Sequence, residues 1–286
     1  MPGVAVVTDS TSSLDPVDAA RADISIIPLQ VVIGEISRPE SEVRPREVAR
    51  ALREGRQVST SRPAREVIEQ TYVELAGAGY DSIVSVHLSR KISGTCSAAQ
   101  VAAASVDIPI NVVDSMTLAM AAGYAALTGA EAARSGAAPD EVASAVRRRA
   151  AASTTYFYVD SLEYLRRGGR MGMASAMLGS ALAVKPLLTV ADGEIRPYER
   201  VRTQSKALTR LWELSLAALE RAASAHAHGL VDVAVHHLDN PDGAQRLVDR
   251  LSGRVQVGEI VISEVSAVLG VHVGPGTLGI VVSPRA

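Results

Sequence analysis

The sequence predicts an α/β protein of two domains: an N-terminal, mostly parallel sheet with helices on both faces, and a C-terminal α+β domain with a mixed sheet. Three observations predict this fold. The 286 residues exceed one average domain. Strand and helix patterns alternate over residues 1–152, as they do in βαβ units. From residue 153 the alternation gives way to a hairpin and mixed elements. We therefore predict domains at residues 1–152 and 153–286.

Short runs of β-branched residues that end at polar turns predict the strands of the first domain. These runs are residues 4–7, 24–33, 82–88 and 110–113. Segments of small or charged residues predict its helices, several with proline in the first turn, where a backbone N–H is not needed. They are residues 16–22, 47–54, 64–76, 97–105, 116–134 and 139–152. Prolines and charges predict a loop at residues 38–46.

The second domain is predicted to begin with an aromatic and β-branched strand at residues 154–159. A short charged helix or turn follows and ends at Gly168-Gly169. The turn Asp192-Gly193 between two apolar runs predicts a β-hairpin of residues 187–191 and 194–201. Further strands are expected at residues 231–236, 257–265 and 279–283, and helices at residues 205–225 and 241–251.

Composition excludes several classes of function. A formal charge of -2 gives no cationic footprint for nucleic acid, and 3% aromatic residues leave little for stacking on bases. We therefore expect no nucleic-acid partner. One cysteine excludes an internal disulfide. The sequence shows no charged, apolar leader and no unbroken apolar run of membrane-spanning length, so we expect a cytoplasmic protein without integral membrane association.

Known motifs of nucleotide and metal sites do not fit. The run Gly274-Pro275-Gly276-Thr277-Leu278-Gly279 has the GxGxxG spacing, but a strand follows it where the dinucleotide motif requires a helix. The pairs His226/His228 and His236/His237 lack carboxylate or thiolate partners. We interpret them as ordinary surface histidines, and we predict no metal site and no cofactor.

Hydroxyl groups gather where predicted strands lead into helices. Ser93 and Gly94 lie between the strand at 82–88 and the next helix, where free backbone N–H groups can hold an anion. Thr60 and Ser61 precede another helix. Each pair alone is explained equally well as helix capping. Together with other polar strand ends, they predict one crevice at the carboxyl edge of the sheet.

The second domain supplies cations and a flexible apolar face. Arg170 follows the Gly168-Gly169 turn, and His272 is expected in a glycine-rich loop at residues 270–276. A solvated turn and a tight loop are the alternative interpretation. The apolar face consists of Met171, Met173, Met177, Leu178 and Leu182. Such side chains suit a pocket for ligands of variable shape, although core packing is their usual role. Cys96 is interpreted as a small packing residue.

Short polar motifs follow one another along the whole chain in a specific order. They are Thr8-Asp9-Ser10; Thr60-Ser61-Arg62-Pro63; Leu88-Ser89 with Ile92-Ser93-Gly94-Thr95; Val113-Asp114-Ser115; residues 161–170; Leu178-Gly179 through Lys185-Pro186; Val201-Arg202-Thr203; and His272-Val273-Gly274-Pro275-Gly276. By these motifs the chain resembles the DegV family, bacterial fatty-acid-binding proteins that serve as the lipid-carrying subunits of fatty acid kinase. The resemblance implies a long-chain fatty acid buried between the two domains.

The resemblance also implies roles for particular residues. The hydroxyls of Thr60 and Ser93 correspond to those that hold the carboxylate. The supporting polar network consists of Ser61, Gly94, Arg170 and His272. The carrier catalyses nothing itself and presents the carboxylate to a partner fatty acid kinase subunit, which makes the acyl phosphate. Together with local charge, the resemblance points to Arg200, Arg202 and Lys206 as the docking surface of that partner. We expect a monomer.

Two other classes of function stay open. Ser93 as a nucleophile with His272 as its base would make an esterase or acyl transferase. A small-molecule sensor or phosphotransfer accessory protein would hold a polar ligand in the same crevice.

Overall fold

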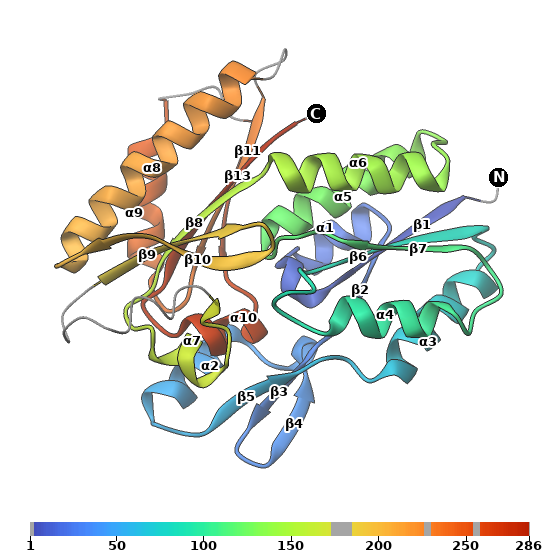
Figure 1. Ribbon diagram of the computed structural model, residues 1–286, viewed down its shortest axis with the longest axis horizontal. Helices are drawn as coiled ribbons and strands as arrows, with labels where there is room; N and C mark the ends of the chain where they lie inside the picture. Colours follow the sequence, from blue (N-terminus) through green and yellow to red (C-terminus); the bar gives the residue numbers. More distant parts are fainter. Residues whose placement is uncertain (1–2, 173–184, 226–229, 254–257, 286) are drawn as a thin grey trace.

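A four-stranded parallel sheet forms the centre of the N-terminal half, in the order β2-β1-β6-β7 (Figure 1). The computed structural model describes residues 3–172, 185–225, 230–253 and 258–285. The strands are β1 (Val4–Asp9), β2 (Ile24–Ile27), β6 (Ser82–His87) and β7 (Ile110–Asp114). Their alternating side chains are buried on both faces: Val6 packs on one side, and Ala5 and Val7 pack on the other.

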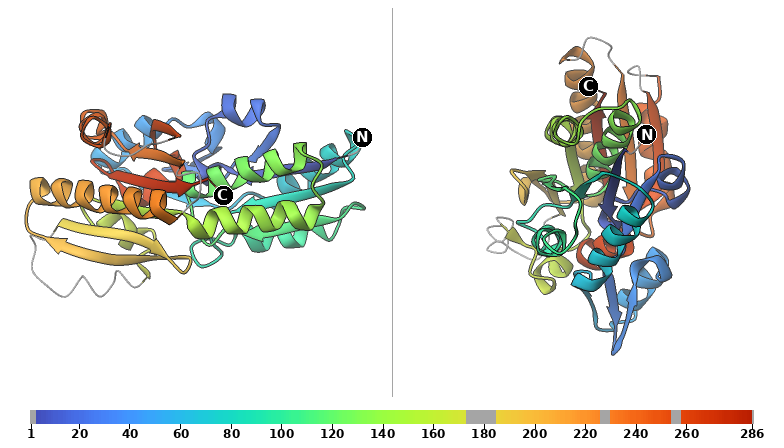
Figure 2. Two further views of the ribbon diagram at one scale, coloured as in Figure 1. Left: turned by 90° about the horizontal axis from the view of Figure 1, so that it is seen from above. Right: turned by 90° about the vertical axis from the view of Figure 1, so that its right-hand side faces the viewer.

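Helices cover both faces of this sheet, as predicted (Figures 1 and 2). One face carries α1 (Pro16–Arg21), α5 (Met120–Arg134) and α6 (Pro139–Ala152), and the other carries α3 (Arg65–Gly77) and α4 (Thr95–Ala103). Proline stands in the first turn of α1 and α6. The Asp15 carboxylate accepts a hydrogen bond from the Val17 N–H and caps α1.

A small antiparallel sheet, in the order β4-β3-β5, differs from the predicted elements. Its strands are β3 (Gln30–Ile33), β4 (Ile36–Pro39) and β5 (Val58–Ser61). The predicted strand at 24–33 is two strands in two sheets, because Pro28 lies between them and has no N–H to donate. The predicted loop at 38–46 contains the 3-10 helix η2 (Glu40–Glu42) and the start of α2 (Pro45–Arg53). A further 3-10 helix, η1 (Ser10–Ser12), follows β1.

The C-terminal half contains a six-stranded mixed sheet, in the order β10-β9-β8-β13-β11-β12. The strands are β8 (Thr154–Tyr158), β9 (Lys185–Ala191), β10 (Glu194–Val201), β11 (Val231–His237), β12 (Glu259–Glu264) and β13 (Leu278–Pro284). β9 and β10 form the predicted hairpin, and Asp192 and Gly193 at its turn have φ of 51° and 78°. Such positive φ values suit aspartate and glycine.

The two faces of this sheet have different neighbours. α8 (Gln204–Ala225) and α9 (Pro241–Leu251) cover one face, and the other packs against the N-terminal half through residues such as Ala234 and Val281 (Figure 1). A buried ion pair joins Arg149 of α6 to Asp232 of β11 at 2.7 Å. None of the helices in the part of the chain that the structure describes is long and apolar enough to cross a membrane.

Candidate ligand-binding site

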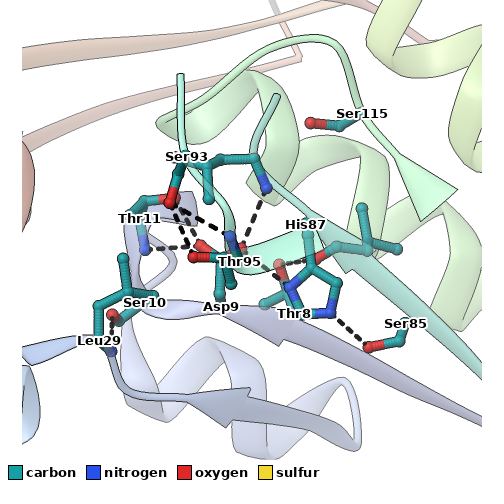
Figure 3. Close-up of polar contacts among 12 residues, drawn as sticks. Thr8, Asp9, Ser10, Thr11, Leu29, Ser85, His87, Ser93, Thr95 and Ser115 are labelled. Carbon is teal, nitrogen blue, oxygen red and sulfur yellow. Dashed lines mark hydrogen bonds and ion pairs between the residues drawn. The ribbon is translucent and has the colours of Figure 1, made fainter. Parts of the chain in front are cut away.

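A buried carboxylate holds together the turns that follow β1 and β6. Asp9 accepts hydrogen bonds from the Thr11 hydroxyl at 2.5 Å, the Thr11 N–H at 3.1 Å and the Leu88 N–H at 3.0 Å. Its second oxygen lies 3.0 Å from Nδ1 of His87. Figure 3 shows Ser93 above this cluster, beside Thr11. Asp9 thereby fixes the strand ends from which the Ser93 loop projects.

The cluster continues into the sheet as a chain of hydrogen bonds. Nε2 of His87 lies 2.8 Å from the Ser85 hydroxyl, and the Tyr72 hydroxyl donates to the same oxygen at 2.8 Å. Burial raises the pKa of Tyr72 above its ordinary value. Asp9, His87 and Ser85 have the order of a hydrolase triad, but Ser85 is fully buried. A substrate has no access to the Ser85 hydroxyl. We therefore interpret this series of hydrogen bonds as a contribution to the stability of the fold.

Ser93 lies in the loop before α4 and organises the start of that helix. Its Oγ is 2.9 Å from the Thr95 hydroxyl and accepts a hydrogen bond from the Thr95 N–H at 3.3 Å (Figure 3). The side chain is half-buried. Gly94 lies under the Arg62 side chain, whose Nη1 would be 3.3 Å from a Cβ at this position. Cys96 in the first turn is fully buried, which raises the pKa of its thiol and agrees with a packing role.

Thr60 and His272 meet across the two halves of the chain. The Thr60 hydroxyl is 2.9 Å from Nε2 of His272, which belongs to α10 (Ala267–Val273). Burial, reinforced by the nearby Arg170 guanidinium, lowers the pKa of His272 to about 4. The imidazole is therefore neutral at pH 7 and carries one N–H. Its Nδ1 is buried and has no hydrogen-bond partner among the described residues.

The start of α10 is held by two capping groups. The Ser266 hydroxyl accepts a hydrogen bond from the Leu269 N–H at 3.3 Å, and the Glu40 carboxylate accepts one from the Val268 N–H at 2.5 Å. Burial raises the pKa of Glu40. These contacts fix a helix that carries His272 at its other end.

The turn after α7 (Glu163–Arg167) fixes the imidazole from the other side. A Cβ on Gly168 would lie 2.1 Å from Nδ1 of His272, so only glycine lets the backbone approach the ring this closely. Arg170 donates to the Gly168 carbonyl at 2.5 Å and to the Ile92 carbonyl at 3.3 Å. Ile92 precedes Ser93, so Arg170 links the turn to the Ser93 loop.

Three predictions about these residues are wrong in detail. Thr60 and Ser61 lie on β5 of the small sheet, not at a helix start on the edge of the parallel sheet. His272 lies in a helix rather than a glycine-rich loop, because burial and capping stabilise α10. His236 and His237 are buried rather than exposed. His226 and His228 lie outside the described residues.

An apolar cavity begins at Arg170 and His272 and extends along the six-stranded sheet. The cavity has a volume of about 60 Å³. The apolar lining includes Ile92, Leu118, Phe157, Leu165, Ile195, Leu269, Val273 and Val281. A separate groove, lined by Thr60, Arg56 and Arg167, also reaches Arg170 and His272. These two side chains therefore lie where a polar groove meets an apolar cavity.

The walls of the cavity come mainly from elements that the sequence interpretation did not single out. Met173, Met177, Leu178 and Leu182 lie outside the described residues. Met171 is buried in a cluster with Phe157, Leu165 and Ile195, which line the cavity. The sequence signal that could identify these walls is the alternation of side chains in β8 and β13. This alternation places Phe157 and Gly279 on one face of the sheet.

The residues proposed for partner docking lie on the surface. Arg200, Arg202 and Lys206 are exposed around the end of β10 and the start of α8. Arg200 pairs with Pro186 of β9, next to Lys185, whose Nζ donates to the Asp160 carboxylate at 2.6 Å. Their role stays a prediction. No hydrogen bond joins Ser93 to His272 among the described residues, so the arrangement lacks the contact that a serine nucleophile and its base require.

Known proteins resemble this chain over its whole length. The model of the family described as "Uncharacterised protein, DegV family" matches residues 3–285. A DegV domain-containing protein of Streptomyces coelicolor is 50% identical over 284 residues, which is 99% of each chain. Protein DegV of Bacillus subtilis is 36% identical over 282 residues, 97% of this chain and 98% of the relative.

Solved structures agree with the sequence comparison. The crystal structure of DegV from Bacillus subtilis, described as a fatty acid binding protein, matches with a TM-score of 0.90 and 33% identity over 100% of both chains. A fatty-acid-binding DegV family protein from Thermus thermophilus matches with a TM-score of 0.90 and 29% identity, over 99% of this chain and 100% of the other. The fold and the sequence lead to the same conclusion: this chain belongs to the DegV family.

Proposed function

We propose that the protein binds one long-chain fatty acid, with the acyl chain in the cavity and the carboxylate at Thr60 and Ser93, and presents that carboxylate to a separate kinase. The observation that carries the proposal is the position of Arg170 and His272 at the junction of an apolar cavity and a polar groove. A fatty acid has the matching division into a hydrocarbon chain and an anionic end. The two related structures described as fatty-acid-binding support the same class of ligand.

The energetics favour such a ligand. Burial of an acyl chain of about sixteen carbons contributes at most about 12 kcal/mol, at about 0.8 kcal/mol per methylene and before the entropy of binding is subtracted. A carboxylate without partners would cost several kcal/mol at this position. The hydroxyls of Thr60 and Ser93 and the guanidinium of Arg170 are donors that offset this cost.

The protonation of His272 decides whether Thr60 can donate to the ligand. A neutral imidazole carries its proton on either nitrogen. With the proton on Nε2, the ring donates to the Thr60 oxygen at 2.9 Å and leaves the hydroxyl hydrogen free for the carboxylate. With the proton on Nδ1, the Thr60 hydroxyl donates to Nε2 instead. We assign the proton to Nε2 in the ligand-bound protein, because that form makes Thr60 a donor.

The groove supports the proposed presentation of the carboxylate to a kinase. Phosphorylation of a carboxylate needs access for a phosphoryl donor, and the groove reaches the Thr60 and His272 pair from outside. Arg56 and Arg167 line the groove and supply positive charge for a phosphate group. Resemblance to the DegV family supplies the kinase as the partner, and the three exposed cations at Arg200, Arg202 and Lys206 remain the proposed docking surface.

A native mass spectrum of the protein expressed in bacteria tests the binding. We expect an adduct with the mass of a fatty acid, and loss of that adduct in the double variant Ser93→Ala, Thr60→Val. Ser97→Ala removes an exposed hydroxyl from α4 and should keep the adduct. A protein that is empty and takes up no labelled fatty acid would refute the proposal. Addition of a bacterial fatty acid kinase and ATP should then yield an acyl phosphate, trapped by hydroxylamine as the hydroxamate.

A further inference from the structure

Arg62 follows β5, the strand that carries Thr60, and its side chain reaches the Ser93 loop. A Cβ at Gly94, the residue after Ser93, would lie 3.3 Å from Nη1 and 3.8 Å from Cδ of Arg62. The glycine therefore leaves the space that the guanidinium occupies. Arg62 is two residues from Thr60 in the sequence, so its side chain connects the strand of one proposed carboxylate ligand to the loop of the other.

A ring of contacts surrounds the position proposed for the carboxylate. Each member of the ring is joined to the next by a hydrogen bond, a close contact or a short stretch of backbone. The members are Thr60, His272, Gly168, Arg170, Ile92, Ser93, Gly94 and Arg62. Arg62 closes the ring, because it leads from Gly94 back to β5. A carboxylate held by Thr60 and Ser93, as proposed, would lie within this ring.

The two cations of the ring, Arg62 and Arg170, have different surroundings. Arg170 is half-buried and lines the apolar cavity. Arg62 is exposed and lines an outer groove together with Ser61. Arg56 precedes β5 and Arg62 follows it, so the strand separates these two arginines. Arg62 is therefore placed to meet a group that is added to the carboxylate from the solvent side.

The Arg62 guanidinium has no hydrogen bond or ion pair with the residues that the structure describes. Arg65, which lines the same outer groove, differs in this respect. Arg65 pairs with the Glu69 carboxylate at 3.4 Å and donates to the Ser105 hydroxyl at 2.5 Å. The N–H donors of Arg62 are therefore available to an anionic group, whereas those of Arg65 are partly used.

We propose that Arg62 binds the phosphoryl group that the kinase transfers to the fatty acid, so that this residue helps the protein to hold the acyl phosphate. The inference rests on the proposed function and names a residue that recognises its product. In the transfer, a carboxylate oxygen bonds to the terminal phosphorus of ATP, the bond from that phosphorus to the bridging oxygen breaks, and ADP leaves.

The product differs from the fatty acid in the charge and reach of its head group. A carboxylate carries one negative charge, and a phosphoryl group carries about two. The proposed carboxylate site already has Thr60, Ser93 and Arg170 as donors, so the added phosphoryl oxygens need a further one. A guanidinium suits them, because it forms two parallel hydrogen bonds with phosphate oxygens.

Binding of a stable analogue of the acyl phosphate tests the inference. The analogue is 2-oxoheptadecylphosphonate, in which a methylene group replaces the bridging oxygen of palmitoyl phosphate. The protein is stripped of lipid, and Kd is measured for the phosphonate and for palmitic acid in the wild-type chain, in Arg62→Gln and in Arg65→Gln. Arg65→Gln removes a guanidinium from the same outer groove, which makes it the matched control. Arg62 makes no hydrogen bond to the described residues, so Arg62→Gln should fold like the wild-type chain.

The decisive comparison is between the two ligands in Arg62→Gln. We expect this variant to raise the Kd for the phosphonate about tenfold and the Kd for palmitic acid by less than about threefold, and we expect Arg65→Gln to change neither by more than about threefold.

Three results overturn the inference while fatty-acid binding itself stands. They are equal effects of Arg62→Gln on the two ligands, an equal loss of phosphonate binding in Arg62→Gln and Arg65→Gln, and a wild-type chain that binds palmitic acid but not the phosphonate. A phosphonate Kd that Arg62→Gln leaves unchanged also overturns it. A wild-type chain that binds neither ligand refutes the proposed function instead.

Discussion

Substitution of Gly168 by alanine tests whether the contact between Thr60 and His272 determines ligand affinity. Gly168 has φ of -75° and ψ of -7°, so alanine fits its backbone conformation without strain. The added Cβ would lie 2.1 Å from Nδ1 and 2.7 Å from Cε1 of His272. The substitution therefore acts through the imidazole ring rather than through the turn.

The size of the effect follows from these distances. Ordinary van der Waals contact requires about 3.4 Å or more, so the ring must move by more than about 1 Å. Such a movement breaks the 2.9 Å contact with the Thr60 hydroxyl. Overpacking of this kind costs about 1–3 kcal/mol of stability. Loss of a hydrogen-bonded donor to a charged group costs about 1.5–3 kcal/mol of binding, which is about tenfold or more in Kd.

The assay is a Kd measurement with a fluorescent fatty acid, combined with urea unfolding of the same samples. Gly77→Ala is the control, because a Cβ at this residue of α3 would meet nothing within 4 Å. We expect that control to keep its affinity and Gly168→Ala to lose it. The effects of Gly168→Ala and Thr60→Val on Kd should also be non-additive, because both remove the same contact. In a chain that already carries Thr60→Val, Gly168→Ala should raise Kd only slightly further. Wild-type affinity in Gly168→Ala, or full additivity with Thr60→Val, would refute the reasoning.

Two further predictions concern stability. The pKa of His272 is about 4 in the folded chain and about 6.5 when unfolded, so the unfolded chain binds more protons between these values. The free energy of unfolding should therefore fall by up to about 3 kcal/mol, because of this residue, as the pH falls from 6.5 to 4. His272→Gln should flatten the pH dependence of the free energy measured by urea unfolding, and an unchanged slope would contradict this. Asp232→Ala should cost about 3–5 kcal/mol, because it leaves the buried Arg149 without its carboxylate. Chemical denaturation measures this loss of unfolding free energy. The double variant Asp232→Ala, Arg149→Met should recover part of it. A cost below about 1 kcal/mol for Asp232→Ala would show that the ion pair does not hold the two halves together.

Local patterns in the sequence were sufficient for the elements whose formation depends on neighbouring residues. The hairpin around Asp192 and Gly193 follows from the positive φ that its turn requires, and the helix at Pro139–Ala152 begins at a proline in its first turn. The buried parallel strands also follow from their continuous β-branched composition. These signals lie within a few residues of each other, so no long-range contact is needed to interpret them.

Features of the fold that depend on contacts between distant residues are predicted wrongly from the sequence. α10 contains Gly270 and spans seven residues, so its local propensity for helix is weak. It is stabilised by Glu40, which is far away in the sequence and caps the Val268 N–H. His236 gives no sequence signal of burial, because its partners Ser263 and Met120 come from other elements.

Local sequence patterns were enough to indicate the alternation of strands and helices, the family resemblance and the residue types available for an anion. How these residues combine depends on contacts between distant parts of the chain. Thr60 and His272 are 212 residues apart and meet at 2.9 Å because the small sheet packs against α10. Periodicity fixes local conformation, whereas burial and pairing depend on which distant surfaces come together.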